Sequence, residues 1–242
     1  MYAEIVGASS NQPLVALHGG IGTGEYHWSK QIKGLSQNYE LHLPDLPGHG
    51  RTPLPSDGSY DRDLQVAAIE EYLDGLGAPA HVAGFSMGGH ACLALATKRP
   101  EIFKTLTLIG VSVGEHKGLD GWRNKFDPDI LAREYPVWAR HLSKIHEPLG
   151  GPEAWKDVCR RDSKGLRVDV EVEQLQGVSC PVLLTRGDSD PAVDPTHYAA
   201  LRSVWEQAEE FVVPGGAHDV QLTRARVFQP VFLEFLKRAE RL

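Results

Sequence analysis

The sequence predicts an α/β fold, in which helices cover both faces of a mostly parallel central sheet. Two observations support this prediction: short apolar runs recur along the chain, and segments with a helical spacing of apolar residues lie between them. A parallel sheet is covered on both faces, so its strands are apolar throughout. The alternation of strands and helices indicates one sheet built from strand and helix units.

Six runs are predicted to form strands of four to six residues, and most of them end at or beside Gly or Pro. These predicted strands cover residues 14–17, 40–44, 81–85, 105–110, 181–185 and 210–213.

Three segments between and after these runs show helix signals. Between Val66 and Leu76, apolar residues spaced by three and four share one helix face. A helix is predicted to begin at Asp194-Pro195, where a capping carboxylate precedes the residue favoured at the first helical position. A last helix is predicted over about 223–238. Its apolar stripe is expected to consist of Val227, Val231, Phe232 and Phe235.

The segment 115–172 breaks the alternation. It holds three of the five tryptophans, several helix-like stretches and no clear strand pattern. We therefore predict a single domain over residues 1–242 with a helical insertion at 115–172.

Composition excludes several classes of protein. The chain has 242 residues and a formal net charge of −7, so a phosphate-backbone partner is not expected. The three cysteines show no C-x-x-C spacing, which argues against a disulfide framework or a zinc site. No secretory pattern opens the chain, and the apolar stretch at 106–114 is too short to span a bilayer. The expectation is a cytoplasmic protein that binds neither nucleic acid nor membrane, with its oligomeric state left open.

A candidate nucleophile lies in Gly84-Phe85-Ser86-Met87-Gly88, between a predicted strand and a helix of small and apolar residues. A nucleophile on such a sharp turn has a strained backbone, and side chains two residues away on either side would collide with it. Glycine at both positions meets this requirement. We predict Ser86 as the nucleophile and the Met87 N–H, at the helix start, as a donor to an oxyanion.

A second glycine-rich loop, His18-Gly19-Gly20-Ile21-Gly22, follows the first predicted strand. It can turn a backbone N–H into the site because no side chain obstructs it. We predict that Gly20 supplies the second oxyanion donor. The loop lacks the Gly-Lys-Ser/Thr of a phosphate-binding loop.

A serine hydroxyl needs a base, and His218 lies in a loop after a predicted strand, at the ligand-binding edge of the sheet. A carboxylate must then orient the imidazole. Asp190 is predicted for this role because Pro191 restricts it to an extended backbone. Asp188 is the alternative, although a turn can use its carboxylate, and Asp194 is a distant third because it is predicted to cap a helix.

Together these motifs resemble those of the α/β-hydrolase superfamily over essentially the whole chain. The segment from Leu43 to Thr52 is similar to the family's P-D-x-x-G-x-G-x-S motif, with Thr52 in place of serine, and Ala217 stands where glycine is common. The resemblance implies that residues 115–172 form a cap over the pocket. Its candidate substrate-binding residues are Trp122, Arg123 and Trp138.

Three functions follow from the motifs and the resemblance. The first is hydrolysis of an ester, lactone or thioester of a small molecule through an acyl-enzyme on Ser86, with no metal or organic cofactor. The second is the chemistry of meta-cleavage-product hydrolases or of the menaquinone-pathway lyase, for which arginines in the cap would bind anionic substrates. The arginines concerned are Arg123, Arg133 and Arg140. The third is a non-catalytic small-molecule receptor on the same fold.

Overall fold

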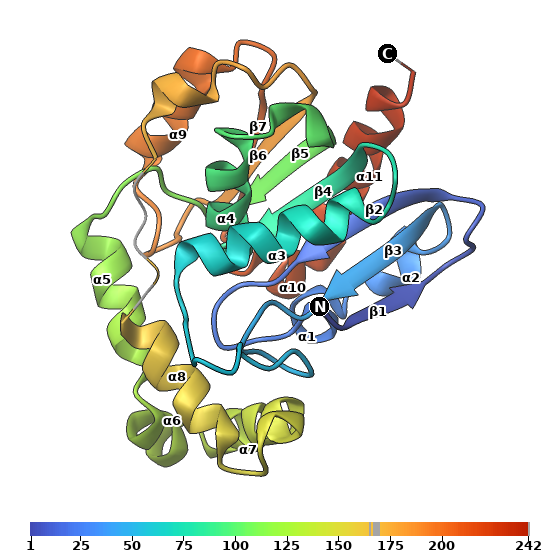
Figure 1. Cartoon of the computed structure of the whole chain (residues 1–242). Coiled ribbons are helices and arrows are strands. Elements are labelled where there is room, and N and C mark those ends of the chain that lie inside the picture. Colours follow the sequence, from blue (N-terminus) through green and yellow to red (C-terminus); the bar gives the residue numbers. More distant parts are fainter. Residues whose placement is uncertain (165, 167–169, 242) are drawn as a thin grey trace.

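The computed structural model describes residues 1–164, 166 and 170–241, and its centre is a seven-stranded sheet (Figure 1). The strands are β1 (Ala3–Val6), β2 (Gln12–Leu17), β3 (Tyr39–Pro44), β4 (Ala80–Phe85), β5 (Phe103–Ile109), β6 (Val182–Gly187) and β7 (Glu209–Val213). Their order across the sheet is β1-β3-β2-β4-β5-β6-β7. Every neighbouring pair is parallel except β1 with β3, which is antiparallel. The predicted α/β fold is therefore confirmed.

All six predicted strands are present, within three residues at each end. The edge strand β1 was not predicted, because its side chains are exposed or half-buried and it shows no apolar run. Ile5, for example, is 52% exposed. An edge strand on a partly solvated sheet lacks the continuous apolar pattern that identifies the inner strands.

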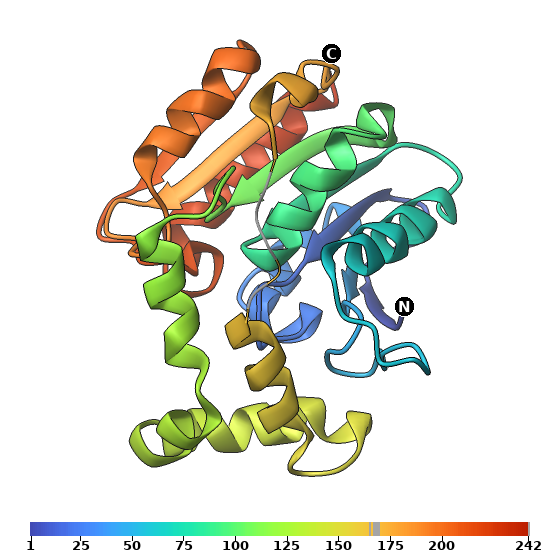
Figure 2. The ribbon, with the colours of Figure 1, turned by 60° about the vertical axis from the view of Figure 1, so that its left-hand side comes forward.

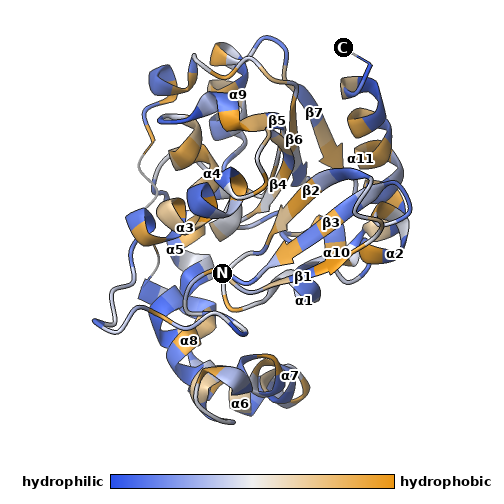
Figure 3. Ribbon diagram, turned by 45° about the vertical axis from the view of Figure 1, so that its right-hand side comes forward, coloured by the Kyte–Doolittle hydropathy of each residue, from blue (hydrophilic) through white to orange (hydrophobic). Residues whose placement is uncertain are grey.

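Helices pack on both faces of the sheet. One face is covered by α3 (Arg62–Asp74), α4 (Met87–Ala96) and α9 (Pro195–Val204), and the other by α1 (Gly24–Trp28), α2 (Ile32–Leu35), α10 (Val220–Thr223) and α11 (Ala225–Ala239). Successive side chains of a strand point to opposite faces, so Val15 joins the first core cluster and Leu14 the second. Figure 3 shows the strands as predominantly apolar and the helices as mixed.

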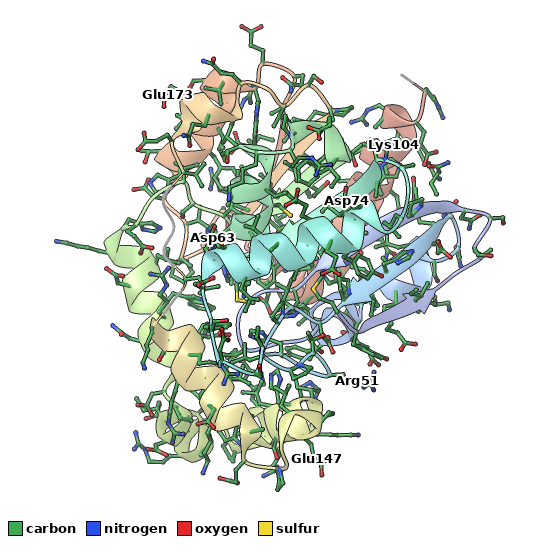
Figure 4. The ribbon with its side chains drawn as sticks, in the orientation of Figure 1. Arg51, Asp63, Asp74, Lys104, Glu147 and Glu173 are labelled. Carbon is green, nitrogen blue, oxygen red and sulfur yellow. The ribbon has the colours of Figure 1, made fainter. Side chains whose placement is uncertain are left out.

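Two predicted helix features are confirmed. In α3, Val66 and Leu73 are buried, whereas Asp63 and Asp74 lie exposed near its two ends (Figure 4). The carboxylate of Asp194 caps α9 by accepting the N–H of Thr196 at 2.9 Å.

The apolar stripe predicted for the last helix is wrong at Val227, which is 43% exposed. The segment divides at Arg224 into α10 and α11, and the buried positions of α11 are Phe228, Phe232, Phe235 and Leu236. Phenylalanine buries more apolar area than valine, so the helix rotates to place its three aromatic rings against the sheet.

The chain between β5 and β6 forms α5 (Lys117–Arg123), α6 (Pro128–Glu134), α7 (Pro136–His146) and α8 (Ala154–Lys164). In Figures 1 and 2, α6, α7 and α8 lie together at one end of the molecule. Their small core includes Leu142 and Trp155, and it also takes in Ile21 from the loop after β2. Of the predicted insertion 115–172, residues 165 and 167–169 lie outside the described residues. Over the described residues, none of the helices is long and apolar enough to cross a membrane.

Candidate active site

Ser86 occupies a strained turn between β4 and α4. Its φ is 48° and its ψ is −113°, a conformation that residues with a side chain rarely adopt. A Cβ on Gly84 would lie 2.6 Å from the Cα of Gly89, and one on Gly88 would lie 2.6 Å from the carbonyl oxygen of His18. Both flanking glycines are thus required by close backbone packing, which explains why this turn needs the G-x-S-x-G pattern.

The structure brings Ser86, His218 and Asp190 together from the ends of β4, β7 and β6. The Ser86 Oγ lies 2.9 Å from His218 Nε2, and His218 Nδ1 lies 2.8 Å from Asp190 Oδ2. The side chains of His218 and Asp190 are only 5% and 1% exposed. A carboxylate beside Nδ1 favours the tautomer with the proton on that nitrogen, which leaves Nε2 to accept the serine proton.

The two alternative carboxylates are engaged elsewhere. Asp188 is exposed and accepts the N–H of Gly215 and the hydroxyl of Ser189, both at 3.0 Å. The hydrogen bond from Gly215 holds the pKa of Asp188 below its ordinary value. Asp194 caps α9. Asp190, by contrast, accepts only one hydrogen bond from a backbone group in the described residues, from the N–H of Ala192 at 2.9 Å. This bond helps to fix the Asp190 side chain against the imidazole.

Gly20 and Met87, the predicted oxyanion donors, line a cavity together with Ser86. Over the described part of the chain, neither backbone N–H donates a hydrogen bond to a protein atom. The N–H of Gly88 donates to the His18 carbonyl at 3.0 Å and so ties the glycine loop to the start of α4. The Met87 amide is one of the first N–H groups of a helix, which have no partner within the helix.

Buried histidines hold the glycine loop in place. The Nδ1 of His18 lies 2.8 Å from the Gly19 carbonyl, and its Nε2 accepts the N–H of Leu46 at 2.9 Å. The N–H of Gly19 donates to the His27 ring at 3.2 Å. These rings satisfy backbone groups that burial would otherwise leave unpaired, so both histidines support the structure of the loop.

Asp162 of α8, which sequence reasoning missed, joins the insertion to the same loop. It is buried and accepts hydrogen bonds from the Ile21 N–H, from Tyr60 Oη and, at 3.0 Å, from His49 Nε2. Burial opposes its charge, but His49 and these hydrogen bonds hold the pKa of Asp162 below its ordinary value. One signal was available: Asp162 continues a buried helical stripe, where an unpaired carboxylate is disfavoured. The stripe consists of Trp155, Val158, Cys159 and Asp162.

Two cavities flank Ser86, and both are open to solvent. The arginine cavity, with a volume of about 40 Å³, is lined by Arg62, Arg123 and Met87 among others. The tryptophan cavity, with a volume of about 120 Å³, includes Trp138 and His218. The residues common to both are Gly20, Ser86, Trp122 and Phe126.

The predicted substrate-binding residues therefore all line these cavities. The Trp122 ring centroid lies 5.0 Å from that of His218. Of the other cap arginines considered, Arg133 and Arg140 are exposed, and Arg133 pairs with Glu134 at 2.9 Å. Arg62 was not singled out in the sequence, because an arginine in the first turn of a helix is usually a solvated charge.

No group of three or more His, Cys, Asp or Glu side chains in the described residues is arranged to hold a metal ion. Burial raises the pKa of the Cys92 and Cys159 thiols to about 12. A thiol with such a pKa is protonated at neutral pH and is a poor nucleophile.

Because several histidines are buried, we expect the free energy of unfolding to fall in acid. Burial lowers the pKa of His27 to about 3 and that of His146 to about 4. Below about pH 6.5 the unfolded chain therefore binds more protons than the folded one, and the free energy of unfolding falls by about 1.4 kcal/mol per pH unit for each such histidine. Urea unfolding at pH 7.5, 6.0 and 4.5 measures this loss.

His146→Asn serves as the matched variant for this measurement. The ring of His146 accepts the Gly50 N–H at 3.0 Å and lies 3.1 Å from the Ile21 carbonyl, and an amide keeps both a donor and an acceptor there. The variant should show a shallower loss of stability in acid. A free energy of unfolding that stays constant from pH 7.5 to 4.5 in the parent protein would contradict the prediction.

Comparison with known proteins places the chain in a family. Residues 14–229 match the alpha/beta hydrolase family. Lipase 3 of Moraxella sp. (strain TA144) is 25% identical over 229 residues, which cover 86% of this chain and 72% of the lipase. A pimeloyl-(acyl-carrier protein) methyl ester esterase of Nitrosospira multiformis is 24% identical over 245 residues, covering 90% of this chain and 91% of the esterase.

A solved structure agrees with this placement. The meta-cleavage product hydrolase of Pseudomonas fluorescens superposes with a TM-score of 0.79 at 21% identity, over 98% of this chain and 94% of that one. A likeness at this identity concerns the fold, and it reproduces the sheet and helices described above. Since the family match spans most of the sequence, the chain belongs to the alpha/beta hydrolase family of enzymes.

Proposed function

We propose that this hydrolase is a serine esterase that cleaves small-molecule esters through an acyl-enzyme on Ser86. The observation that carries the proposal is the unbroken hydrogen-bonded chain from Ser86 Oγ through His218 to Asp190. Beside it lie the Gly20 and Met87 amides, which donate to no protein atom of the described residues. The lipase and the methyl ester esterase among the relatives support ester hydrolysis.

In the first half-reaction, Ser86 Oγ attacks the ester carbonyl carbon while His218 Nε2 takes the hydroxyl proton. The carbonyl oxygen becomes an oxyanion, which the N–H groups of Gly20 and Met87 stabilise. Asp190 stabilises the imidazolium that forms. The carbon–oxygen bond then breaks, and His218 returns its proton to the departing alcohol.

In the second half-reaction, water takes the place of the alcohol. His218 removes a proton from the water, and the resulting hydroxide attacks the acyl carbon bonded to Ser86. The same two amides stabilise the second oxyanion. The carboxylic acid leaves as Ser86 Oγ recovers its proton, so that the only co-reactant is water.

The residues that line the two cavities suggest which part of the ester each cavity binds. His218 lines the tryptophan cavity and must reach the leaving oxygen, so the alcohol part is placed there. The arginine cavity contains Met87 but not His218, and it is assigned to the acyl part. In this assignment the helices of the insertion act as a cap, because Trp122, Phe126 and Trp138 roof the two cavities.

A panel of p-nitrophenyl esters from acetate to decanoate, together with a fluorophosphonate probe, tests the proposal. Ester turnover and labelling, both absent in Ser86→Ala, would support the esterase. Labelling without turnover of any ester would instead favour carbon–carbon bond hydrolysis or lyase chemistry. A protein that neither labels nor turns over esters would be a receptor, and the proposal would be wrong.

The cavity assignment predicts the effect of Trp138→Ala. Removing this wall of the tryptophan cavity should change the preference among esters that differ in the alcohol part, because pocket shape discriminates by about 1–3 kcal/mol per methylene. The ratio of kcat/KM between methyl and butyl esters of one acid measures the change.

Trp155→Ala is the matched control, since Trp155 is 4% exposed in the core of the insertion. It should lower the melting temperature and leave the ratio of kcat/KM values near that of the parent protein. If Trp138→Ala instead lowered kcat/KM equally for all esters along with the melting temperature, Trp138 would belong to the core of the insertion and the assignment would fail.

A further inference from the structure

Arg62, the first residue of α3, carries a half-buried positive charge beside the candidate nucleophile. Its guanidinium lines the arginine cavity and donates to the carbonyl oxygens of Met87 and Leu166, each at 3.1 Å. Burial lowers the pKa of Arg62 to about 10, which leaves it cationic at neutral pH. Within the described residues its guanidinium hydrogen-bonds carbonyl oxygens and no carboxylate.

A second guanidinium stands next to it. Arg123 of α5 also donates to the Leu166 carbonyl, at 3.0 Å, so that two like charges converge on a single oxygen. Their repulsion contributes to lowering the pKa of Arg62. Arg123 pairs with Glu115 at 2.6 Å, and the negative charge of Glu115 also opposes the lowering of the Arg62 pKa. Arg62 itself donates to carbonyl oxygens, so among the described residues its guanidinium has no carboxylate bonded to it.

The other titratable groups of the arginine cavity are bonded elsewhere and not to Arg62. The carboxylate of Asp162 is occupied by His49, Tyr60 and the Ile21 amide. The ring of His90 accepts the N–H of Ser112 at 2.9 Å, and burial lowers its pKa well below the ordinary value. Arg62 therefore presents a guanidinium to the cavity beside Ser86 without a carboxylate bonded to it in the described part of the chain.

From this geometry we infer that the arginine cavity binds a carboxylate on the acyl part of the substrate, so that half-esters of dicarboxylic acids are preferred. The inference rests on the proposed esterase function and names its substrate class. Two of the five N–H donors of Arg62 are used by carbonyls, and the remaining ones can bind a carboxylate, the anion that guanidinium geometry matches. The acyl part is placed in this cavity because the alcohol must lie near His218.

Two methyl esters of equal length test the inference: monomethyl adipate, which carries the carboxylate, and methyl hexanoate, which does not. The parent protein is expected to show a higher kcat/KM for monomethyl adipate. In Arg62→Gln the ratio of the two kcat/KM values should fall about 10-fold to 100-fold, as expected for the loss of a charge-assisted hydrogen bond. The ratio is insensitive to any partial loss of folded protein.

Further variants separate charge from shape. Arg62→Lys keeps the charge and should retain part of the ratio, and Arg123→Gln should lower it if Arg62→Gln does not fold. Arg133→Gln, at an exposed position of α6, should leave the ratio at the parent value. An unchanged ratio in Arg62→Gln, or an equal loss for both esters, would mean that Arg62 only supports Met87 and Leu166 and would overturn the inference.

Two more measurements complete the test. A preference for 4-acetoxybutanoate, whose carboxylate lies on the alcohol part, would overturn the placement of the anion. Calorimetric titration with adipate reports on the cavity without turnover: binding that is lost in Arg62→Gln supports the carboxylate site even if neither ester is hydrolysed. In that case the esterase proposal alone would fail. Absence of adipate binding together with hydrolysis of methyl hexanoate would overturn only the inference.

Discussion

Replacing Ser86 with alanine is expected to lower kcat for ester hydrolysis by about 10³-fold to 10⁶-fold, because only the oxyanion donors and binding interactions remain to assist the reaction. The fold should persist. The Ser86 side chain does not cap α4, and its hydroxyl is bonded to His218 within the site. The measurement is kcat on a p-nitrophenyl ester, with the melting temperature recorded in parallel.

Ser189→Ala is the control for this variant. Ser189 is exposed and bonds Asp188 in the loop that also carries Asp190. Its removal should leave kcat and fluorophosphonate labelling near the parent values. Normal activity in Ser86→Ala would show that Ser86 is not the nucleophile, whatever the melting temperature of the variant.

Asp190→Asn is expected to lower kcat by up to about 10⁴-fold, because an amide leaves the imidazole of His218 in the wrong tautomer and without a partner for its positive charge. The fold should tolerate the change, since the amide oxygen of asparagine can still accept the Ala192 N–H. The measurement is kcat on the ester used for Ser86→Ala.

Asp188→Asn provides the matched comparison, because Asp188 lies two residues away but faces solvent and bonds Gly215. It should change kcat by no more than a few-fold. Should the larger loss appear in Asp188→Asn, the carboxylate that orients His218 would be Asp188 and the assignment of Asp190 would be wrong.

Much of the site could be predicted because its parts are local. A strand, a turn with two glycines and a helix occupy consecutive residues around Ser86, so the strain that the turn requires is visible in the sequence. The same holds for the loops that carry Gly20 and His218, each of which directly follows a strand. Strands that run parallel end at one edge, which is why these separate loops meet.

Local pattern alone determined the α/β fold, six of its seven strands and the residues grouped around Ser86. Only the tertiary structure decided that Arg62 faces the cavity and that Asp162 anchors the glycine loop. Arg62 meets Leu166 across 104 residues, and Asp162 meets His49 across 113. Periodicity specifies which residues share a helix face, but the docking of the helices determines what that face contacts, and this depends on packing summed over the whole chain.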